Sequence, residues 1–278
     1  PHLVNIYGLI PAINQTLDLV KNRPEDTVGL SNPCELHGNI EFSTIKFKYT
    51  PSEPSYILDN VSFHIESGEF VGIVGESGSG KSTLLKLILG FLKPESGSIY
   101  LDRMHIEKVN KQLLRRQIGT VLQEASLLPG NILSNIIGAS SQTLEDAWNA
   151  AKIANIDHEI NNLPMGMHTV ITEGGSTFSS GQKQRLFIAK AIISKPRLLL
   201  FDEATSSLDN YSQSQITKSI ETLNATRVVV AHRLTTIKHA DRIIVLDKGK
   251  VVQEGTYDTL MADESGKFFD LAKRQLLG

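Results

Sequence analysis

Residues 75–82, Gly75-Glu-Ser-Gly-Ser-Gly-Lys-Ser82, decide the fold of this chain because of what lies on either side of them. Before this stretch, Phe70-Val-Gly-Ile-Val74 is a short apolar run, typical of a buried parallel strand. After it, Thr83-Leu-Leu-Lys-Leu-Ile-Leu89 is rich in helix-forming residues and ends at Gly90, a residue suited to a C-cap. A strand, a glycine-rich turn, Lys-Ser and a helix in this order predict a phosphate-binding P-loop.

The chemistry of this loop favours an anion. Glycines allow backbone N–H groups to converge, and the helix N-terminus adds the positive end of its dipole. Lys81 would reach the β- and γ-phosphates of a nucleotide, and the Ser82 hydroxyl would bind Mg²⁺. The alternative is a Gly/Ser-rich turn that happens to precede a helix. The other predicted nucleotide contacts in this stretch are Gly75, Ser77, Gly78, Ser79, Gly80 and Thr83.

Composition limits the class of protein. The chain has 278 residues, 40% of them apolar and 21% charged, as is ordinary for a globular protein. A net charge of −2 offers no broad attraction for nucleic acid, so we expect no nucleic-acid partner and local anion binding. The single cysteine, Cys34, excludes an internal disulfide and a cysteine zinc cage, and favours a cytosolic location.

The first 33 residues differ from the rest. Apolar residues recur near helical spacing over residues 1–20, Pro11 interrupts them, and a polar linker follows as far as Pro33. A packing arm is one interpretation. We favour the other, that residues 1–33 are the end of a transmembrane-domain helix and a linker, leaving the main domain at 34–278. The chain starts at Pro1 rather than Met, which suggests a piece of a longer polypeptide. No apolar run here could cross a bilayer, and this does not imply that the parent protein lacks such a segment.

Hydrophobic patterning predicts an α/β fold in three parts. Residues 38–65 alternate as antiparallel strands do, whereas 198–201 and 227–231 are apolar runs typical of a buried sheet. Residues 131–163 read as helices, and Thr143 with Asp146 resembles a capping box. We therefore expect a P-loop NTPase (RecA-like) mixed sheet core, an antiparallel β subdomain, and an inserted α-helical subdomain at about 124–195. Further helices are expected at 111–117, at 181–194 and in the segment that ends at about Leu223. Further strands are expected at 97–102, 118–122 and 243–246. A hairpin turn at 248–250 and two amphipathic helices close the chain.

Two adjacent acids follow the apolar strand at 198–201. Burying them would be costly unless they face a cation or water. In a P-loop protein, Asp202 fits the residue that holds Mg²⁺, and Glu203 is placed to activate the attacking water. The alternative is an acidic helix N-cap.

Three polar or aromatic residues have weaker signals. Gln123 ends a strand and could bind a metal-bound or attacking water, but it could also be an ordinary loop residue. His232 follows the strand 227–231, at the sheet edge that faces ligands in open α/β folds, although a lone histidine is usually structural. Tyr49 could stack on a nucleotide base or simply pack across strands.

The segment Phe178-Ser-Ser-Gly-Gln-Lys-Gln-Arg185 resembles the signature motif of the ATP-binding cassette (ABC) family. The resemblance covers roughly residues 38–278, because the other motifs follow in the family's order: the P-loop, Gln123, the strand ending at Asp202 and Glu203, the turn at Ser207-Leu-Asp209, and His232.

The resemblance implies a role for each motif. It makes Tyr49 the adenine-stacking aromatic, Gln123 a catalytic and metal-contacting glutamine, Glu203 the catalytic glutamate and His232 the switch histidine, alongside Lys81. It also implies that two copies sandwich two MgATP head to tail. Each copy would then contact the partner's nucleotide through Ser179, Gly181, Gln182 and Asp209.

This chain departs from the family in its signature. Ser180 stands where glycine is usual, and Phe178 replaces the usual leucine. The phenylalanine is a mild apolar exchange. Ser180 adds a Cβ at what we expect to be a turn, which would alter the contact with the partner's phosphate.

Other segments resemble those of exporters. Thr172-Glu173-Gly174 is similar to the segment that touches exporter transmembrane domains, and residues 163–175, 201–210 and 230–241 resemble bacteriocin-type peptide exporters. The resemblance implies an ATPase at the cytoplasmic face of the membrane, with transmembrane domains on the same full-length chain. A lipid or multidrug exporter would share every motif. An importer ATPase should lack the N-terminal helix, and a non-transport ABC protein predicts coiled coils or a second cassette, which are not seen.

Overall fold

The structure is a computed structural model that describes residues 29–277, apart from 124, 173–174, 176, 203–209 and 232. For residues 210–214 and 276–277 it describes the backbone only. The chain divides into two units, Pro1–Ser31 and Asn32–Gly278, and the fold below is that of the larger unit. The helix predicted over residues 1–20 lies outside the described residues.

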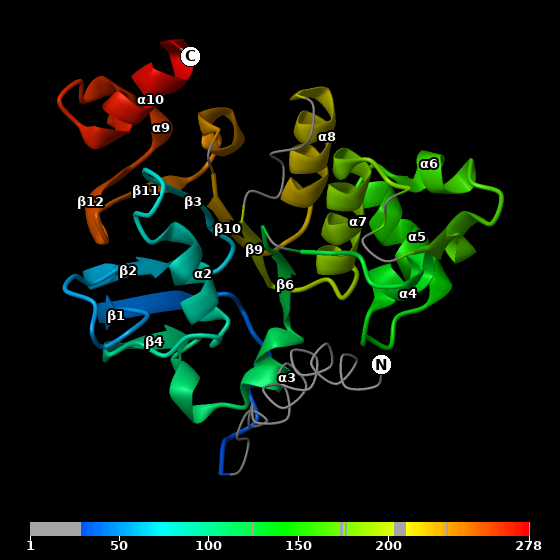
Figure 1. Ribbon diagram of the computed structural model, residues 1–278, viewed down its shortest axis with the longest axis horizontal. Helices are drawn as coiled ribbons and strands as arrows, with labels where there is room; N and C mark the ends of the chain where they lie inside the picture. The colour runs from blue at the N-terminus through cyan, green and yellow to red at the C-terminus, as the bar shows by residue number, and fades with distance from the viewer. Residues whose placement is uncertain are drawn as a thin grey trace, which may run out of the picture. The chain divides into compact units, whose positions relative to one another are not determined.

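A six-stranded, mostly parallel sheet forms the centre of this unit (Figure 1). Its strand order is β12-β11-β3-β10-β9-β6, and only β12 runs antiparallel to its neighbour. Every residue of β3 and β9 is buried, as expected for apolar strands covered on both faces. The strand bounds are β3 Phe70–Val74, β6 Ile118–Val121, β9 Leu198–Asp202, β10 Thr226–Val230, β11 Arg242–Asp247 and β12 Lys250–Gly255.

A second sheet is antiparallel and has the order β2-β1-β4-β5. The strands are β1 Ile40–Phe47, β2 Leu58–Ile65, β4 Ser96–Leu101 and β5 Met104–His105. Alternate residues of β1 point into the core, where Phe42 stacks on Phe63 with ring centroids 4.5 Å apart. Helix α2 (Lys81–Ile88) lies between this sheet and the central one (Figure 1).

The inserted segment folds as a helical lobe, defined here as α4–α7, which lies beyond β6 and β9 (Figure 1). The predicted capping box is confirmed: Thr143 Oγ1 accepts from Asp146 N, and the Asp146 carboxylate accepts from Thr143 N. Two short strands, β7 (Gly130–Asn131) and β8 (Val170–Ile171), pair across the lobe and were not expected. The helices are α4 Ile132–Ile137, α5 Leu144–Ile153, α6 Asp157–Asn161 and α7 Ser180–Ile192.

The remaining elements agree with the sequence pattern within a few residues at their ends. They are α3 Lys111–Arg115, α8 Asn210–Glu221, α9 Tyr257–Ala262 and α10 Lys267–Leu277. Short 3₁₀ turns, which the sequence patterns did not predict, lie at η1 Ile106–Lys108, η2 Gly166–His168 and η4 Leu234–Ile237. Among the described residues, no helix is both long and apolar enough to span a membrane.

The central sheet separates two hydrophobic clusters. Because side chains alternate along a strand, Phe70 and Val74 of β3 join one cluster, and Val71 and Ile73 join the other. The first cluster continues into the helical lobe, and the second continues through α2 into the antiparallel sheet. The P-loop strand is therefore fixed from both faces.

Candidate nucleotide site

The P-loop connects the end of β3 to the first residue of α2, as its sequence predicts. Gly80 is the N-cap of α2 with φ 102°, a left-handed conformation that favours glycine, and it offers no side-chain cap. The first N–H groups of α2 therefore have no capping oxygen from the N-cap side chain. An anion at this helix N-terminus would satisfy them.

Lys81 and Ser79 are buried inside the loop, at 5% and 4% exposure. The Lys81 ammonium donates to the carbonyl of Gly75 at 2.9 Å and to that of Glu76 at 2.8 Å. No described residue offers a hydrogen bond to the buried Oγ of Ser79. Since an unsatisfied buried hydroxyl is costly, Ser79 Oγ fits a phosphate oxygen.

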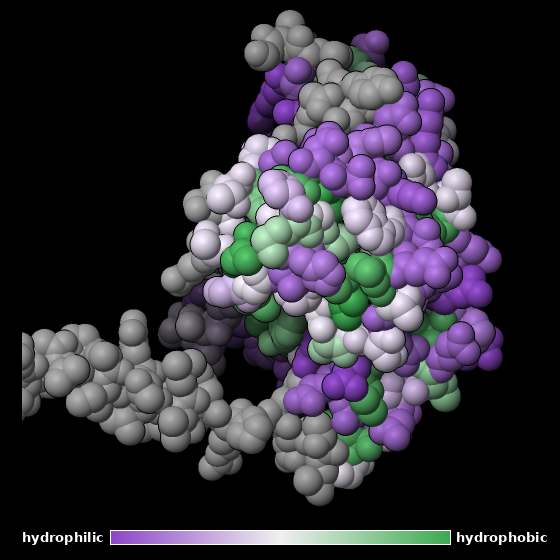
Figure 2. Space-filling view, turned by 90° about the vertical axis from the view of Figure 1, so that its right-hand side faces the viewer, coloured by the Kyte–Doolittle hydropathy of each residue, from purple (hydrophilic) through white to green (hydrophobic). Residues whose placement is uncertain are grey.

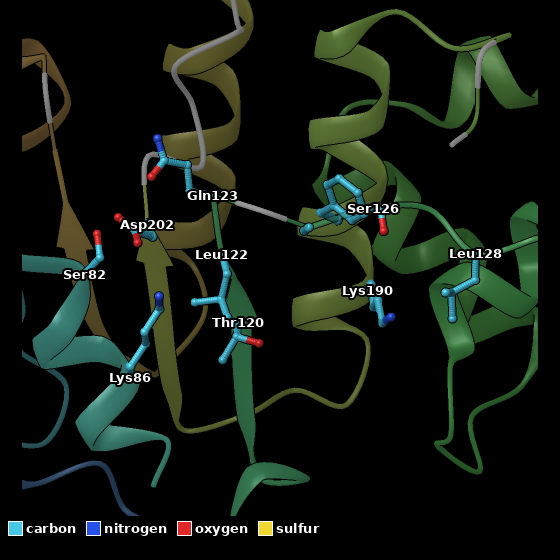
Figure 3. Close-up of a pocket in the computed structure, with 11 residues that line it drawn as sticks. Ser82, Lys86, Thr120, Leu122, Gln123, Ser126, Leu128, Lys190 and Asp202 are labelled. Atoms are coloured by element: carbon cyan, nitrogen blue, oxygen red, sulfur yellow. The ribbon is translucent and has the colours of Figure 1, made fainter. Parts of the chain in front are cut away.

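Ser82, Gln123 and Asp202 come from three different elements and line one cavity of about 360 Å³. Ser82 is on α2, Asp202 ends β9 and is buried, and Gln123 follows β6. Figure 3 shows the three side chains gathered at the same end of the sheet. Their hydroxyl, amide and carboxylate oxygens are the kind of donor that Mg²⁺ prefers.

The same cavity is lined by residues that the sequence patterns did not single out. Lys86 extends from α2 on one side, and Lys190 from α7 on the other (Figure 3). Phe187 of α7 also lines the cavity. The cavity thus lies between the central sheet and the helical lobe. No motif marks these residues, because only the tertiary fold brings α2 and α7 to one space.

Tyr49 follows β1 and remains half exposed, at 50%. Its ring packs edge-on against Phe47 at 5.0 Å, and its hydroxyl lies 3.1 Å from Thr83 Oγ1. Tyr49 thus contacts its own strand and the P-loop helix, and half of it is left exposed beside that helix.

The signature segment begins α7. Ser179 is the N-cap: its Oγ accepts from Gln182 N at 3.2 Å, and Gln182 Oε1 accepts from Ser179 N at 2.9 Å. As an acceptor in this cap, the Ser179 hydroxyl keeps its proton for donation to an anion. Gly181 lies in the same first turn and is partly exposed.

The expectation for Ser180 was wrong. Ser180 is the first residue of α7, not part of a turn, and it is not among the residues with positive φ. A Cβ is accommodated at the first position of a helix, so replacing the usual glycine does not disturb the backbone of the signature.

Glu203, Asp209 and His232 lie outside the described residues. The structure does describe Asp202, which precedes Glu203, and Ala231, which precedes His232. Asp202 of β9 pairs with Val230 of β10, and Ala231 N donates to Ile73 O of the P-loop strand at 3.1 Å. These strand ends therefore meet at one edge of the sheet, beside the P-loop.

A P-loop at the end of a buried parallel strand, with an acid-ended strand two places along the same sheet, defines a P-loop NTPase. The sequence profile of the ABC transporter family matches residues 58–206, and the chain belongs to this family as an ATP-hydrolysing transporter ATPase domain. The predicted fold class is thereby confirmed.

Similar proteins of known name are also ATP-binding proteins of export systems. The chain is 43% identical over 262 residues to the leukotoxin export ATP-binding protein LtxB of Aggregatibacter actinomycetemcomitans, a match to 92% of this chain and 37% of that protein. It is 42% identical over 261 residues to the alpha-hemolysin translocation ATP-binding protein HlyB of Escherichia coli O6:H1, covering 93% and 37%. The chain thus spans little more than a third of these relatives.

Among solved structures, the chain resembles a bacterial Atm1-family ABC exporter with ATP bound. The TM-score is 0.87 with 32% sequence identity, and the match covers 97% of this chain and 48% of the exporter chain.

Proposed function

We propose that this chain is the motor domain of a membrane exporter, which binds and hydrolyses MgATP to move a peptide across the membrane. The single observation that carries the proposal is the meeting of Ser82, Gln123 and Asp202 around one cavity next to an uncapped P-loop helix. These groups match what phosphoryl transfer requires: anion donors, metal ligands and a site for the attacking water.

The proposed chemistry begins in the P-loop. Backbone N–H groups and Ser77, Ser79 and Thr83 would bind the phosphates, and Lys81 would exchange its loop carbonyls for β- and γ-phosphate oxygens. Tyr49 would stack on the adenine. Ser82, Asp202 and Gln123 would hold Mg²⁺, which would neutralise charge on the phosphates. Glu203 would then accept a proton from the attacking water, with His232 and Gln123 orienting the γ-phosphate end.

We further propose that the working form is a head-to-tail dimer, with the signature of one copy completing the site of the other. Support comes from the start of α7, where Ser179 is exposed and Gly181 and Gln182 are partly exposed at the helix N-terminus. Without ATP we expect these 278 residues, studied on their own, to be monomeric, because two copies are then not held together at a high effective concentration.

The proposed partners are transmembrane domains on the full-length chain, which would place this domain at the cytoplasmic face of the membrane. Large apolar side chains in or next to the helical lobe, including Leu128, Met165 and Val170, are more than half exposed. Figure 2 turns this side toward the viewer and shows apolar patches among polar ones. Such patches are typical of protein contacts.

The cargo we propose is a bacteriocin-type peptide. The support is the resemblance of three segments to peptide exporters, together with relatives whose names record leukotoxin export and hemolysin translocation. Closing and opening of the dimer would switch the membrane domains between inward- and outward-facing states.

Glu203→Gln tests the reaction. Removing the general base should slow ATP hydrolysis by about 10²–10⁴-fold, whereas ATP binding should persist because the phosphate cradle is intact. Phosphate release and titration with a fluorescent ATP analogue measure the two quantities. Glu264→Gln, on the exposed turn before α10, is the matched control. Hydrolysis at the rate of the unaltered chain would remove Glu203 from this role.

A further inference from the structure

Two cationic side chains of the C-terminal helix α10 form ion pairs with a residue of the P-loop. Lys267 Nζ lies 3.1 Å from Glu76 Oε1, and Arg274 Nη1 lies 2.9 Å from the same oxygen. Lys267 also lies 3.4 Å from Asp247 Oδ1, at the end of β11. The contact joins the second residue of the P-loop to side chains 191 and 198 positions later in the chain.

Glu76 is bound through its main chain as well. Its carbonyl oxygen accepts from Lys81 Nζ at 2.8 Å and from Ser79 N at 3.2 Å. Glu76 therefore connects α10, through its side chain, to the buried lysine and serine that face the phosphate position, through its backbone. A shift of Glu76 would move the acceptor that now orients Lys81.

The helix that supplies the cations is itself firmly held. Phe268 and Ala272 are buried, at 0% and 1% exposure, and belong to the cluster that includes β11. Phe268 meets Tyr257 edge-on at 5.6 Å, and its N–H donates to Gln253 Oε1 of β12 at 2.8 Å. The cations therefore project from a fixed scaffold.

A third contact extends the reach of α10. Gln275 Oε1 accepts from Leu234 N at 3.0 Å, and Leu234 begins η4, two residues after His232. Lys267, Arg274 and Gln275 recur at helical spacing, seven and eight residues apart, so they lie along one stripe of the helix. One stripe thus contacts two segments at the nucleotide site.

We propose that α10 is a positioning element of the nucleotide site, in which Lys267 and Arg274 hold Glu76 so that the P-loop keeps its phosphate-binding shape. This inference rests on the proposed function, because it concerns the same site. A loop held in its bound shape loses less freedom when a ligand binds. The hydrogen bond from Lys267 also holds the pKa of Glu76 below its ordinary value, so the carboxylate is charged at neutral pH.

Tethering and simple electrostatics give opposite expectations. If the ion pairs tether the loop, removing either the carboxylate or the cations weakens ATP binding. If the groups act only through their charge, removing Glu76 strengthens binding of the anionic nucleotide, and removing the cations weakens it.

The experiment compares Glu76→Gln, the double variant Lys267→Met/Arg274→Met, and all three changes together, in the 278-residue chain. Because these pairs are partly exposed, we expect about a two- to fivefold increase in the ATP dissociation constant for Glu76→Gln and for the double variant. The triple variant should bind ATP no more weakly than Glu76→Gln or the double variant does, since each of these already removes the same ion pairs. Reversing the charges, with Glu76→Lys and Lys267→Glu/Arg274→Glu together, should restore part of the affinity.

Lys273→Met, on an exposed position of the same helix, is the control. Thermal unfolding without nucleotide verifies that each variant is folded. Opposite changes in affinity for Glu76→Gln and the double variant would overturn the tether, and so would changes no larger than in Lys273→Met. If the unaltered chain itself failed to bind ATP, the proposed function would fail instead, so the two failures are distinguishable.

Discussion

Gly75 shows how a single missing atom shapes the loop. A Cβ at this position would lie 2.1 Å from the carbonyl oxygen of Leu246 and 2.6 Å from Ser79 Oγ. The backbone of the loop passes this close to β11 only because glycine has no side chain. The first residue of the P-loop is therefore required by the packing of the empty protein, independently of any nucleotide.

Gly75→Ala should accordingly destabilise the nucleotide-free chain. Overpacking against backbone atoms typically costs about 1–3 kcal/mol, because neither strand can move far. Gly78→Ala is the control: its Cβ would enter open space, so only the strain of φ 78° remains, about 1 kcal/mol. Urea unfolding measures both. Equal losses in the two variants would contradict the steric explanation for Gly75.

At the residue scale, a motif that carries its own chemistry can be located from the sequence, and its position in the fold can then be compared with the structure. Lys81, Ser82 and Asp202 were singled out from local patterns. The structure places Ser82 and Asp202 around one cavity and the Lys81 ammonium on the carbonyl of Gly75. Ser180 was misjudged because the start of α7 cannot be fixed to one residue from sequence. The link from Glu76 to Lys267 left no local signal, since it depends on two elements from distant parts of the chain.

At the scale of elements, the turn between β4 and β5 fastens the segment that leads into β1. The Asp102 carboxylate accepts from the backbone N–H groups of His37, Gly38 and Asn39, and from the Asn39 side chain. Partial burial raises the pKa of Asp102, but these donors outweigh it and hold the pKa below its ordinary value of 3.8. The charged form is therefore favoured by folding.

Asp102→Asn should lower stability by about 1.5–3 kcal/mol at pH 7, because hydrogen bonds to a charged group are lost. A depressed folded pKa adds stability that is present above the ordinary pKa and is lost as the pH falls through the folded pKa. The variant and the unaltered chain should therefore converge below pH 3.8. Denaturant unfolding across pH measures this, with Glu41→Gln as control. A difference that does not depend on pH would contradict it.

Periodicity predicted most elements because their burial follows from one repeating pattern. β1 alternates, β9 is apolar up to its last residue, Asp202, and both fold as expected. The pairing of β7 with β8 was missed because two-residue strands have no period to detect. The order of strands in the sheet likewise depends on crossovers that no single segment encodes.

At the scale of the whole molecule, we predict that Ser179→Arg prevents ATP-dependent dimerisation in a Glu203→Gln chain. The bulky cation would occupy the exposed first turn of α7, where the partner's phosphate is proposed to sit. ATP binding by a single copy should remain, since the P-loop is untouched. Light scattering after size-exclusion chromatography measures the mass with and without ATP.

Glu145→Arg, on an exposed position of α5 in the same helical lobe, is the control and should still dimerise. An ATP-dependent dimer of the Ser179→Arg chain would show that the signature of one copy does not complete the site of another.

The hydrophobic cluster shared by the central sheet and the helical lobe limits how this domain can be recombined. Ile132, Ala151 and Leu186 of the lobe belong to one cluster with Val74 and Phe201 of the sheet. A chimaera that takes residues 130–192 from a relative would leave the apolar side chains of the lobe and the sheet poorly packed against each other, unless the sheet residues were exchanged as well. The lobe is thus inherited together with the face of the sheet on which it rests.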